Sequence, residues 1–318
     1  MKKLISIMIP AYNEEESIPI LYDRLNEILQ TIKYDYEIFF INDGSKDRTL
    51  EIIKELHKKD NRISYLNLAR NYGKEIAMAA GFDYVKGDAV IIMDADLQDP
   101  PPLIPEMIKY WEEGYDDVYC VRRSRKGESF LKKKSSELFY KLLQKLTRVN
   151  ILANVGDFRL LSRRALNAMT HYREHKRYTK GFFSLVGLRK KEILFDRDPR
   201  IAGNTKWNYI SLINLAIEGI TSFTSAPLRV STISGAIIAL IGFLSIVYIV
   251  IYKLLFDGIV EGWSSLASII LFLGGIQLIS IGVLGEYIGR IFDETKRRPL
   301  YFVDEYNGKS EYISKYKE

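Results

Sequence analysis

The sequence predicts an α/β domain with a mainly parallel sheet, followed by an amphipathic helix and two membrane-spanning helices. Two observations predict this fold class. Short apolar runs alternate with helix-like stretches over the first 120 residues, which is the pattern of a parallel sheet covered on both faces. Further on, residues 233–252 and 264–285 contain no charged side chain, and each segment is long enough to cross a bilayer.

The expected strands are short and rich in β-branched or aromatic residues. Helices are expected between them, at about Glu15–Ile32, Lys46–Lys58 and Tyr72–Val85. This region, with the chain up to residue 203, is expected to form one domain. The expected strands are Leu4–Ile9, Tyr36–Ile41, Ile63–Leu68 and Ala89–Met93.

Polar residues follow three of these strands. PAYNE at Pro10–Glu14 follows the first strand, NDGS at Asn42–Ser45 the second, and Asp94-Ala95-Asp96 the fourth. Ligands of open α/β sheets bind at the carboxyl ends of the strands, so these segments are expected to gather at one edge. No GxGxxG follows the first strand, which argues against a dinucleotide-binding oxidoreductase.

Three carboxylates, Asp94, Asp96 and Asp99, lie within six positions of one another, directly before Pro100. A solvated turn is one explanation, because Asp and Pro are ordinary turn residues. The other explanation is a divalent cation, because Mg²⁺ and Mn²⁺ prefer carboxylate oxygens and often bridge to substrate phosphates. The residues by themselves leave both explanations open.

Composition narrows the class of protein. The single cysteine, Cys120, excludes an intramolecular disulfide and a cysteine-based zinc site, and the three histidines are not spaced as metal ligands. The net charge is +6 and the pI is about 9.0. The basic residues cluster at Arg122–Lys134 and beside the apolar segments, which favours phosphate groups and anionic lipid over nucleic acid.

The second half of the chain is expected to meet the membrane. Residues 130–147 and 204–223 read as amphipathic helices, the latter with Trp207 and Tyr209 at one end, as at a membrane interface. We therefore expect an interfacial helix within 204–229, a two-helix hairpin within 230–288 and a tail at 289–318. Gly285 and Gly289 suit close helix packing, which leaves a homo-oligomer open.

Charge around the hairpin predicts its orientation. Arg229 precedes the first span, and Arg290 and Lys296–Arg298 follow the second. By the positive-inside rule, both ends of the hairpin are expected to be cytoplasmic. The start of the chain, MKKLISIMIP, has too short an apolar run for a signal peptide, so both termini are expected in the cytoplasm.

These motifs, in this order and followed by paired spans, resemble the bacterial polyprenyl-phosphate glycosyltransferases. This group is similar to bactoprenol glucosyltransferases and dolichol-phosphate mannose synthases, within inverting glycosyltransferase family 2. The resemblance covers essentially the whole chain and includes Thr205-Lys206-Trp207. It implies a GT-A fold, a nucleotide-sugar donor, a Mg²⁺ or Mn²⁺ ion, a polyprenyl phosphate acceptor, and a multi-pass protein of the bacterial plasma membrane.

The resemblance also implies roles for individual residues. Asp94 would hold the nucleotide and contact the metal, Asp96 the metal and the diphosphate, and Gln98 would complete the protein ligands of the metal. Asp43 would contact the uracil or ribose side of the donor. The residues that would frame the same base and ribose are Pro10, Tyr12 and Glu14.

A lipid phosphate needs positive charge when it approaches an anionic donor. Arg122, Arg200 and Lys206 are expected to clamp this phosphate, because Arg in particular can grip phosphate with two hydrogen bonds. Arg123, Arg125 and Lys126 fit a solvated basic surface equally well. Asp157, in Gly156-Asp157-Phe158-Arg159, matches the catalytic position of the resemblance, as a base or as a group that orients the acceptor.

The predicted function is inverting transfer of one sugar, with glucose from UDP-glucose favoured, to polyprenyl (undecaprenyl) phosphate at the cytoplasmic membrane face. The product would be a lipid-linked sugar for modification of cell-envelope glycans. A membrane-associated nucleotidyltransferase or phosphohydrolase that uses the same Asp94-x-Asp96 is the alternative, and a non-catalytic scaffold gives no reason for three polar strand ends. The sequence leaves the sugar, the acceptor length and the oligomeric state open.

Overall fold

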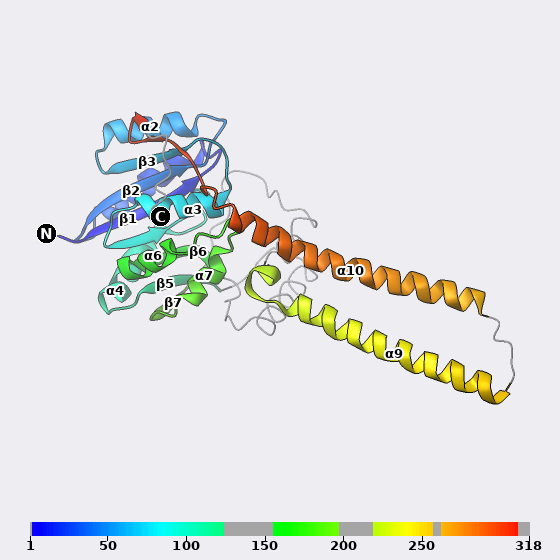
Figure 1. The fold of residues 1–318 in the computed structure, drawn as a ribbon. Helices are drawn as coiled ribbons and strands as arrows, with labels where there is room; N and C mark the ends of the chain where they lie inside the picture. The colour runs from blue at the N-terminus through cyan, green and yellow to red at the C-terminus, as the bar shows by residue number, and fades with distance from the viewer. Residues whose placement is uncertain (1, 124–154, 197–218, 257–261, 311–318) are drawn as a thin grey trace. The chain divides into compact units, whose positions relative to one another are not determined.

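The computed structural model describes residues 2–123, 155–196, 219–256 and 262–310. The chain forms two compact units, one of residues 1–215 with 298–318 and one of residues 216–297. In its described part, the first unit is an α/β domain built on one sheet (Figure 1), with the order β7-β5-β6-β4-β1-β2-β3-β8-β9. The strands are β1 Leu4–Ala11, β2 Asp35–Asn42, β3 Ile63–Leu68, β4 Ala89–Ile92, β5 Asp117–Arg122, β6 Val155–Ser162, β7 Lys190–Phe195, β8 Val303–Tyr306 and β9 Lys309–Ser310.

The centre of the sheet is parallel, as the sequence predicts. β1 pairs with β2 from Leu4 opposite Asp35 to Ala11 opposite Asn42, and it pairs in parallel with β4 on its other side. β2 pairs in parallel with β3. The carboxyl ends of these four strands therefore lie along one edge, and all four strand predictions are confirmed to within about two residues.

Antiparallel strands extend the sheet on both sides, so the sheet as a whole is mixed. β6 runs antiparallel to both β4 and β5, whereas β7 is parallel to β5. On the other side, β8 runs antiparallel beside β3. The alternation of strands and helices predicts only the parallel centre, because β6 and β8 come from parts of the chain that lack this alternation.

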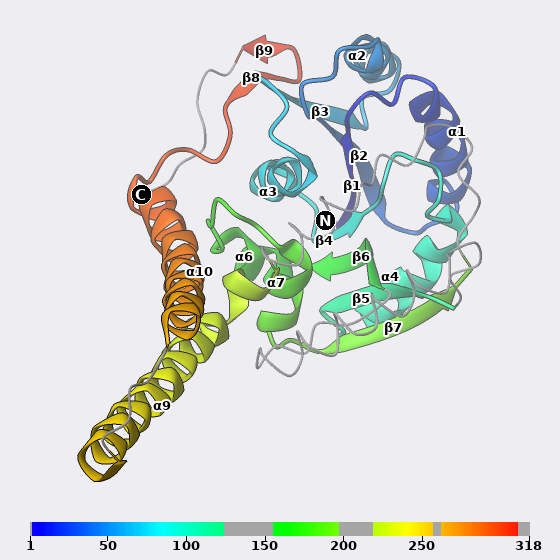
Figure 2. The same ribbon diagram turned by 90° about the vertical axis from the view of Figure 1, so that its right-hand side faces the viewer.

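Helices cover both faces of the sheet (Figure 2): α1, α2 and α4 lie on one face, and α3, α6 and α7 on the other. β1 shows the division, because Ile7 belongs to the core packed under α1 and α4, whereas Met8 faces α3. A Cβ added to Gly81 of α3 would lie 2.5 Å from the Met8 sulfur. The helices are α1 Ser17–Leu29, α2 Thr49–Lys59, α3 Lys74–Tyr84, η1 Pro101–Leu103, α4 Ile104–Glu112, α6 Arg163–Thr170 and α7 Thr179–Leu185.

The chain returns to this sheet after its apolar segments. Residues 298–310 belong to the first unit, where β8 pairs with β3 and β9 pairs with β8. Sequence reasoning treats residues 289–318 as a tail, whereas part of this segment is a strand of the domain. Asp304 and Glu305 occupy the middle of β8, so this short strand lacks the apolar pattern that reveals the central ones.

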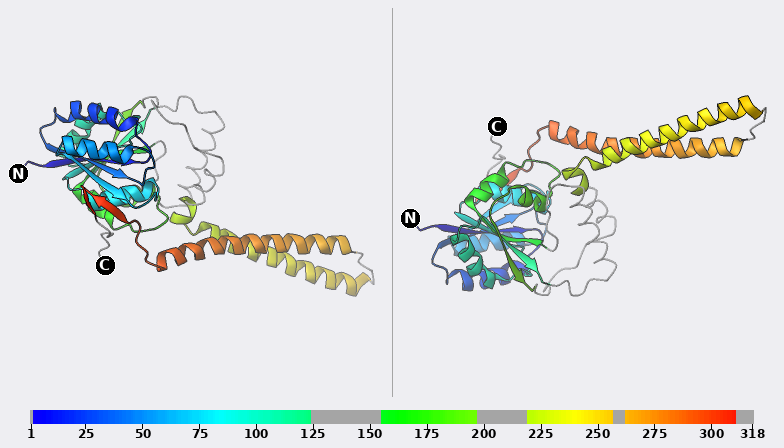
Figure 3. Two further views of the ribbon diagram at one scale, coloured as in Figure 1. Left: turned by 90° about the horizontal axis from the view of Figure 1, so that it is seen from above. Right: turned by 90° about the horizontal axis from the view of Figure 1, so that it is seen from below.

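The second unit is a pair of long apolar helices, α9 Ala226–Phe256 and α10 Trp263–Thr295, which lie side by side (Figure 3). Ala226–Tyr252 and Ser268–Thr295 are long and apolar enough to cross a membrane. The predicted spans fall almost wholly within these segments. Residues 219–223 are helical, but the rest of the predicted helix 204–223, like the predicted helix 130–147, lies outside the described residues.

Candidate active site

The loops that follow β1, β2 and β4 lie at one edge of the sheet and form the candidate site. The first two loops are tied together by hydrogen bonds. The Asn13 amide N–H donates to Ser45 Oγ at 3.0 Å, and the Lys46 amide N–H donates to Asn13 Oδ1 at 2.8 Å. Asn13 has a left-handed φ of 55°, which Asn adopts more readily than most residues. The polar strand ends therefore gather at one edge, as their positions in the sequence predict.

Two carboxylates from different strands meet on one ammonium group. Lys74 Nζ, at the start of α3, lies 2.5 Å from Asp94 Oδ1 after β4 and 2.5 Å from Asp157 Oδ2 in β6. The side-chain exposed fractions are 41% for Lys74, 26% for Asp94 and 9% for Asp157. The cluster is therefore open to solvent at the lysine and closed at Asp157.

The sheet register explains why Asp157 reaches this cluster. β6 is antiparallel to β4, with Arg159 opposite Ile92. Two positions further along each strand, toward the same edge, are Asp157 and Asp94. Because β6 runs against β4, its beginning lies at the edge where the parallel strands end.

The positive charges of the cluster keep Asp157 ionised. Burial by itself would raise the pKa of Asp157, but Lys74 and Lys180 outweigh burial and hold the pKa below its usual value. Burial also opposes the charge on Lys74, yet Asp94 and Asp157 raise the pKa of Lys74 above its usual value. Asp157 and Lys74 are therefore both charged at neutral pH.

The acidic segment after β4 is held in a tight turn. The Gln98 amide N–H donates to Asp96 Oδ1 at 3.2 Å, and the Asp94 amide N–H donates to Asp99 Oδ2 at 3.1 Å. Leu97, between them, is buried and has a left-handed φ of 61°. Such a backbone costs about 1–3 kcal/mol and is often found at functional sites.

This segment fits a hard divalent cation. Asp94 and Asp96 offer carboxylate oxygens, and Gln98 offers an amide oxygen, which are ligands that Mg²⁺ and Mn²⁺ accept. Mg²⁺ is commonly held by one or two carboxylates together with substrate phosphates and water. Within the described residues, no group of three or more His, Cys, Asp or Glu side chains is placed to hold a metal ion.

Asp43 shapes the loop that leads into α3. It is buried, and its two carboxylate oxygens accept the amide N–H groups of Tyr72 at 2.7 Å and Gly73 at 2.8 Å. Burial raises the pKa of Asp43, and these two hydrogen bonds offset part of the rise. A Cβ on Gly44 would lie 2.4 Å from the Arg70 carbonyl carbon, so only glycine lets this loop pack here. Asp43 thus positions the loop that leads into α3.

The other predicted donor residues lie along the same edge. Pro10 is in β1, opposite Ile41 of β2, and Tyr12 is 37% exposed just beyond the end of β1. Glu14 accepts a hydrogen bond from Ser17 Oγ at 2.6 Å on its carboxylate. Glu14 therefore supports the start of α1, and Tyr12 is the more accessible side chain of the two.

The predicted phosphate clamp lies only partly within the described residues. Arg122 is the last residue of β5, and its Nη2 would lie 3.5 Å from a Cβ added to Gly156, next to Asp157. Arg123 is largely exposed and lies 3.8 Å from Asp196, as expected of a surface residue. Arg125, Lys126, Arg200 and Lys206 lie outside the described residues.

Lys74 is the site residue that sequence reasoning missed. The sequence places it inside an expected helix at 72–85, where a lysine is unremarkable. One signal was available, because a lysine in the first turn of a helix opposes the helix dipole. Only the fold brings two carboxylates to its ammonium group.

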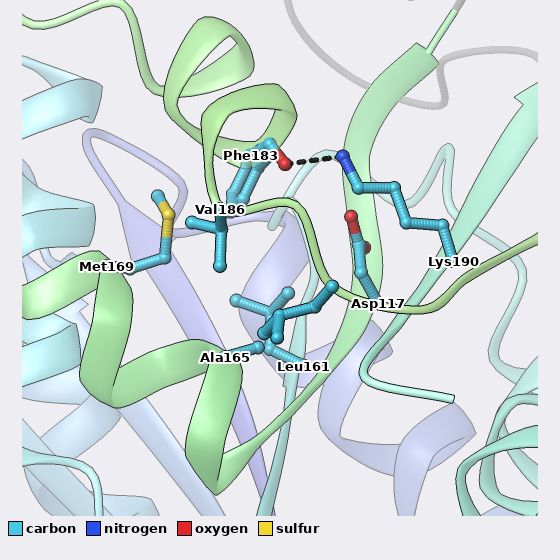
Figure 4. A pocket seen from close by; sticks show the side chains of 8 residues that line it. Asp117, Leu161, Ala165, Met169, Phe183, Val186 and Lys190 are labelled. Atoms are coloured by element: carbon cyan, nitrogen blue, oxygen red, sulfur yellow. Dashed lines mark hydrogen bonds between the residues drawn. The ribbon is translucent and has the colours of Figure 1, made fainter. Parts of the chain in front are cut away.

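A separate small cavity lies away from this edge, between β5, β6, α6 and α7 (Figure 4). Its volume is about 10 Å³, and Lys190 Nζ donates to the Phe183 carbonyl oxygen beside it. This volume holds at most about one water molecule, so the cavity does not accommodate a nucleotide. Its lining residues are Asp117, Leu161, Ala165, Met169, Phe183, Val186, Leu188 and Lys190.

Asp99→Asn is expected to stabilise the metal-free protein at pH 8. Burial, and then the charge of Asp94, raise the pKa of Asp99 from 3.8 to about 7. Between about pH 4 and pH 7, the folded state therefore keeps a proton on Asp99 that the unfolded state releases. The contribution of Asp99 to the free energy of unfolding is complete below about pH 4 and is lost as the pH rises to about 7. The loss amounts to about 2–4 kcal/mol.

Asparagine keeps an oxygen that can accept the Asp94 amide N–H but cannot ionise. Thermal unfolding in detergent with EDTA, at pH 5 and at pH 8, tests this prediction. Wild-type protein should lose more stability between the two pH values than Asp99→Asn does. Equal losses in the two proteins would show that Asp99 does not titrate in this range.

The mixed α/β sheet with an acidic turn after β4 is a GT-A-type fold. Glycosyl transferase family 2 matches residues 6–170, and the GtrB C-terminal hairpin matches residues 226–291. The chain belongs to glycosyl transferase family 2, and the protein is a glycosyltransferase.

Relatives match the chain over nearly its whole length. An uncharacterized glycosyltransferase of Synechocystis sp. is 48% identical over 301 residues, which is 95% of each chain. The bactoprenol glucosyl transferase of Shigella phage SfV is 47% identical over 299 residues, or 94% of this chain and 97% of that protein. Among solved structures, glucosyl-3-phosphoglycerate synthase of Mycobacterium tuberculosis with Mn²⁺ and uridine diphosphate is 18% identical and covers 69% of this chain and 76% of that chain, with a TM-score of 0.47.

Proposed function

We propose that this enzyme transfers one sugar, with glucose from UDP-glucose favoured, to a polyprenyl phosphate such as undecaprenyl phosphate. The product would be a lipid-phosphate-linked sugar for cell-envelope glycans. The observation that carries the proposal is the cluster of Asp94, Lys74 and Asp157 at the strand ends of a chain that also has an apolar hairpin. Relatives named bactoprenol glucosyl transferase, aligned over 94% of this chain, support the lipid acceptor.

The donor is proposed to bind along the β1, β2 and β4 strand ends. Tyr12 is exposed at this edge and would cover the base of the nucleotide. Asp43 fixes the loop of residues 69–74, which is called the donor loop below. Asp94, Asp96 and Gln98 would hold Mg²⁺ or Mn²⁺, which when bound would neutralise the diphosphate and so favour departure of the nucleotide. Lys74 adds a positive charge at the same place, where the charge of the leaving group develops.

Asp157 is proposed to orient the acceptor rather than to remove a proton from it. Its carboxylate is held ionised, with a pKa below its usual value, and a general base is most effective when its pKa is near the working pH. A phosphate monoester needs little deprotonation at pH 7, because its second pKa is about 6. An oriented phosphate oxygen can therefore attack the sugar carbon directly, with inversion.

The acceptor phosphate is proposed to bind at Arg122, with Arg200 and Lys206. Arg122 supports this role because it ends β5 beside Gly156, next to Asp157. A charged guanidinium at this place would offset the repulsion between the lipid phosphate and the donor diphosphate. The same basic residues also favour approach to an anionic membrane surface.

The membrane arrangement is also a proposal. The two apolar segments would cross the bacterial plasma membrane, with the enzyme domain and both termini on the cytoplasmic side. Arg290 and the basic residues 296–298 after the second segment support this orientation. The enzyme domain would then bind its nucleotide-sugar donor on the cytoplasmic side of the membrane.

A transfer assay with a panel of donors tests the proposal. Purified protein in detergent would receive polyprenyl phosphate, Mg²⁺ or Mn²⁺, and one nucleotide sugar at a time. The expected products are a nucleoside diphosphate and one lipid-phosphate sugar. Release of pyrophosphate or free phosphate would instead indicate a nucleotidyltransferase or a phosphohydrolase, and turnover without lipid would contradict the proposed acceptor.

A further inference from the structure

The segment after the second apolar helix packs against the donor loop. We propose that residues 298–306 form a clasp that positions the donor loop (residues 69–74), and that Tyr72 is the positioning residue through which the clasp acts. The inference rests on the proposed function, because that function assigns the loop to nucleotide-sugar binding. The clasp would thereby increase the affinity of the enzyme for the nucleotide sugar.

The clasp contacts the donor loop directly. β8 pairs with β3, as Figure 2 shows, and the ladder continues beyond the strand, where the Ala69 amide N–H donates to the Phe302 carbonyl oxygen at 3.0 Å. The Phe302 amide N–H in turn donates to the Tyr72 hydroxyl at 3.2 Å. Phe302 therefore holds the loop at two positions.

The clasp itself is firmly anchored in the domain. Tyr301 is 3% exposed, and its hydroxyl donates to Asp83 Oδ2 at 2.7 Å. Arg173 grips the same carboxylate with two hydrogen bonds, at 2.6 and 2.7 Å. At the other end, Glu305 forms an ion pair with Lys54 at 2.5 Å. Since both ends of the clasp are fixed, it can serve as a support for the loop.

Tyr72 joins this support to the candidate site. Its hydroxyl accepts from the clasp, while its own amide N–H donates to Asp43 Oδ1 at 2.7 Å. The Arg70 guanidinium stacks over the Tyr72 ring at 4.5 Å, and Gly73 beside it has a φ of 92°, with no atom within 4 Å of the position that a Cβ would take. The Tyr72 hydroxyl thus adds a side-chain contact with the clasp to the backbone hydrogen bond of Ala69.

The position of Lys74 follows from this arrangement. Lys74 comes directly after Gly73 and holds Asp94 and Asp157 together. If the Tyr72 hydroxyl is lost, the loop keeps Asp43 and the Ala69–Phe302 backbone hydrogen bond but loses the contact with the clasp that lies nearest to Lys74, so Lys74 should be placed less well for the donor diphosphate. Binding of the donor should weaken, whereas binding of the lipid phosphate should not.

The test is Tyr72→Phe, which removes the hydroxyl and keeps the ring that Arg70 covers. The matched control is Tyr22→Phe in α1, which also removes one phenol hydrogen bond, to Asp60 at 3.1 Å, and this bond involves no residue of the donor loop. Tyr72→Phe should raise the KM for the nucleotide sugar about three- to tenfold, as expected for one hydrogen bond. The KM for polyprenyl phosphate should stay within about twofold, and Tyr22→Phe should change neither KM nor kcat.

Amide hydrogen exchange gives a second measurement that needs no substrate. In Tyr72→Phe, the amides of Tyr72 and Gly73 should exchange faster, while those of the central strands remain as in wild type. If wild-type protein transfers no sugar, the proposed function fails but exchange still tests the clasp. Unchanged exchange at Tyr72 and Gly73, or an unchanged donor KM in an active enzyme, would overturn the clasp.

Discussion

Asp96→Ala is expected to abolish sugar transfer, with a loss of about 10³-fold or more, while the protein still folds and enters the membrane. A bound divalent cation contributes several kcal/mol to the stabilisation of charge in the transition state. Asp96 lies in the strained turn after β4, where carboxylates and an amide are the available ligands. Without this carboxylate, the diphosphate leaving group would lose most of that stabilisation.

Asp96→Asn distinguishes the effect of the carboxylate charge from the effect of the hydrogen bond that holds the turn. The asparagine oxygen can still accept the Gln98 amide N–H, so the backbone should keep its shape. Transfer should fall nearly as far as in Asp96→Ala, with little change in thermal stability. Asp23→Ala, on the exposed side of α1, is the control for loss of an acidic residue. Full transfer by Asp96→Asn, or by EDTA-treated wild type without added metal, would contradict the assignment.

The parallel centre of the sheet was predictable because its signal is local. β1 to β4 are short apolar runs separated by single helices, so each strand can be recognised from its own residues. Connections between parallel strands are right-handed, which limits the arrangements that these strands can adopt. The polar residues that follow them then fall at one edge without further information. This is why Asp43, Asp94 and Asp96 were found as candidates from the sequence.

The contacts inside the site were not predictable in the same way. Asp157 meets Asp94 because β6 inserts antiparallel beside β4, and this register depends on residues more than 60 positions apart. Lys74 looks like any charged residue of a helix until both carboxylates are placed. β8 carries Asp304 and Glu305 at its centre, so its pairing with β3 is decided by a partner strand that is distant in the sequence.

Lys74→Met is expected to lower transfer about 10²- to 10³-fold and to reduce the free energy of unfolding at pH 8 by about 1–3 kcal/mol. Methionine keeps the length of the side chain but removes the charge that lies 2.5 Å from both Asp94 and Asp157. The stability loss is smaller than for a fully buried ion pair, because 41% of the Lys74 side chain is exposed to screening solvent. In free energy, the expected loss of transfer is larger than the loss of stability, because the donor diphosphate loses the positive charge of Lys74.

The pH dependence of this loss distinguishes a charge effect from a packing effect. Lys74 lowers the pKa of Asp157 against the effect of burial, both through its charge and through its hydrogen bond, so the variant should take up a proton there at a higher pH than wild type does. Its stability deficit should therefore shrink as the pH falls from 8 toward 5, since a protonated Asp157 needs no counter-charge. Lys74→Arg, which keeps a positive charge, should retain most of the stability at pH 8. Thermal unfolding of the three proteins at pH 5 and 8 measures this directly, and a deficit that is the same at both pH values would assign Lys74 to packing instead.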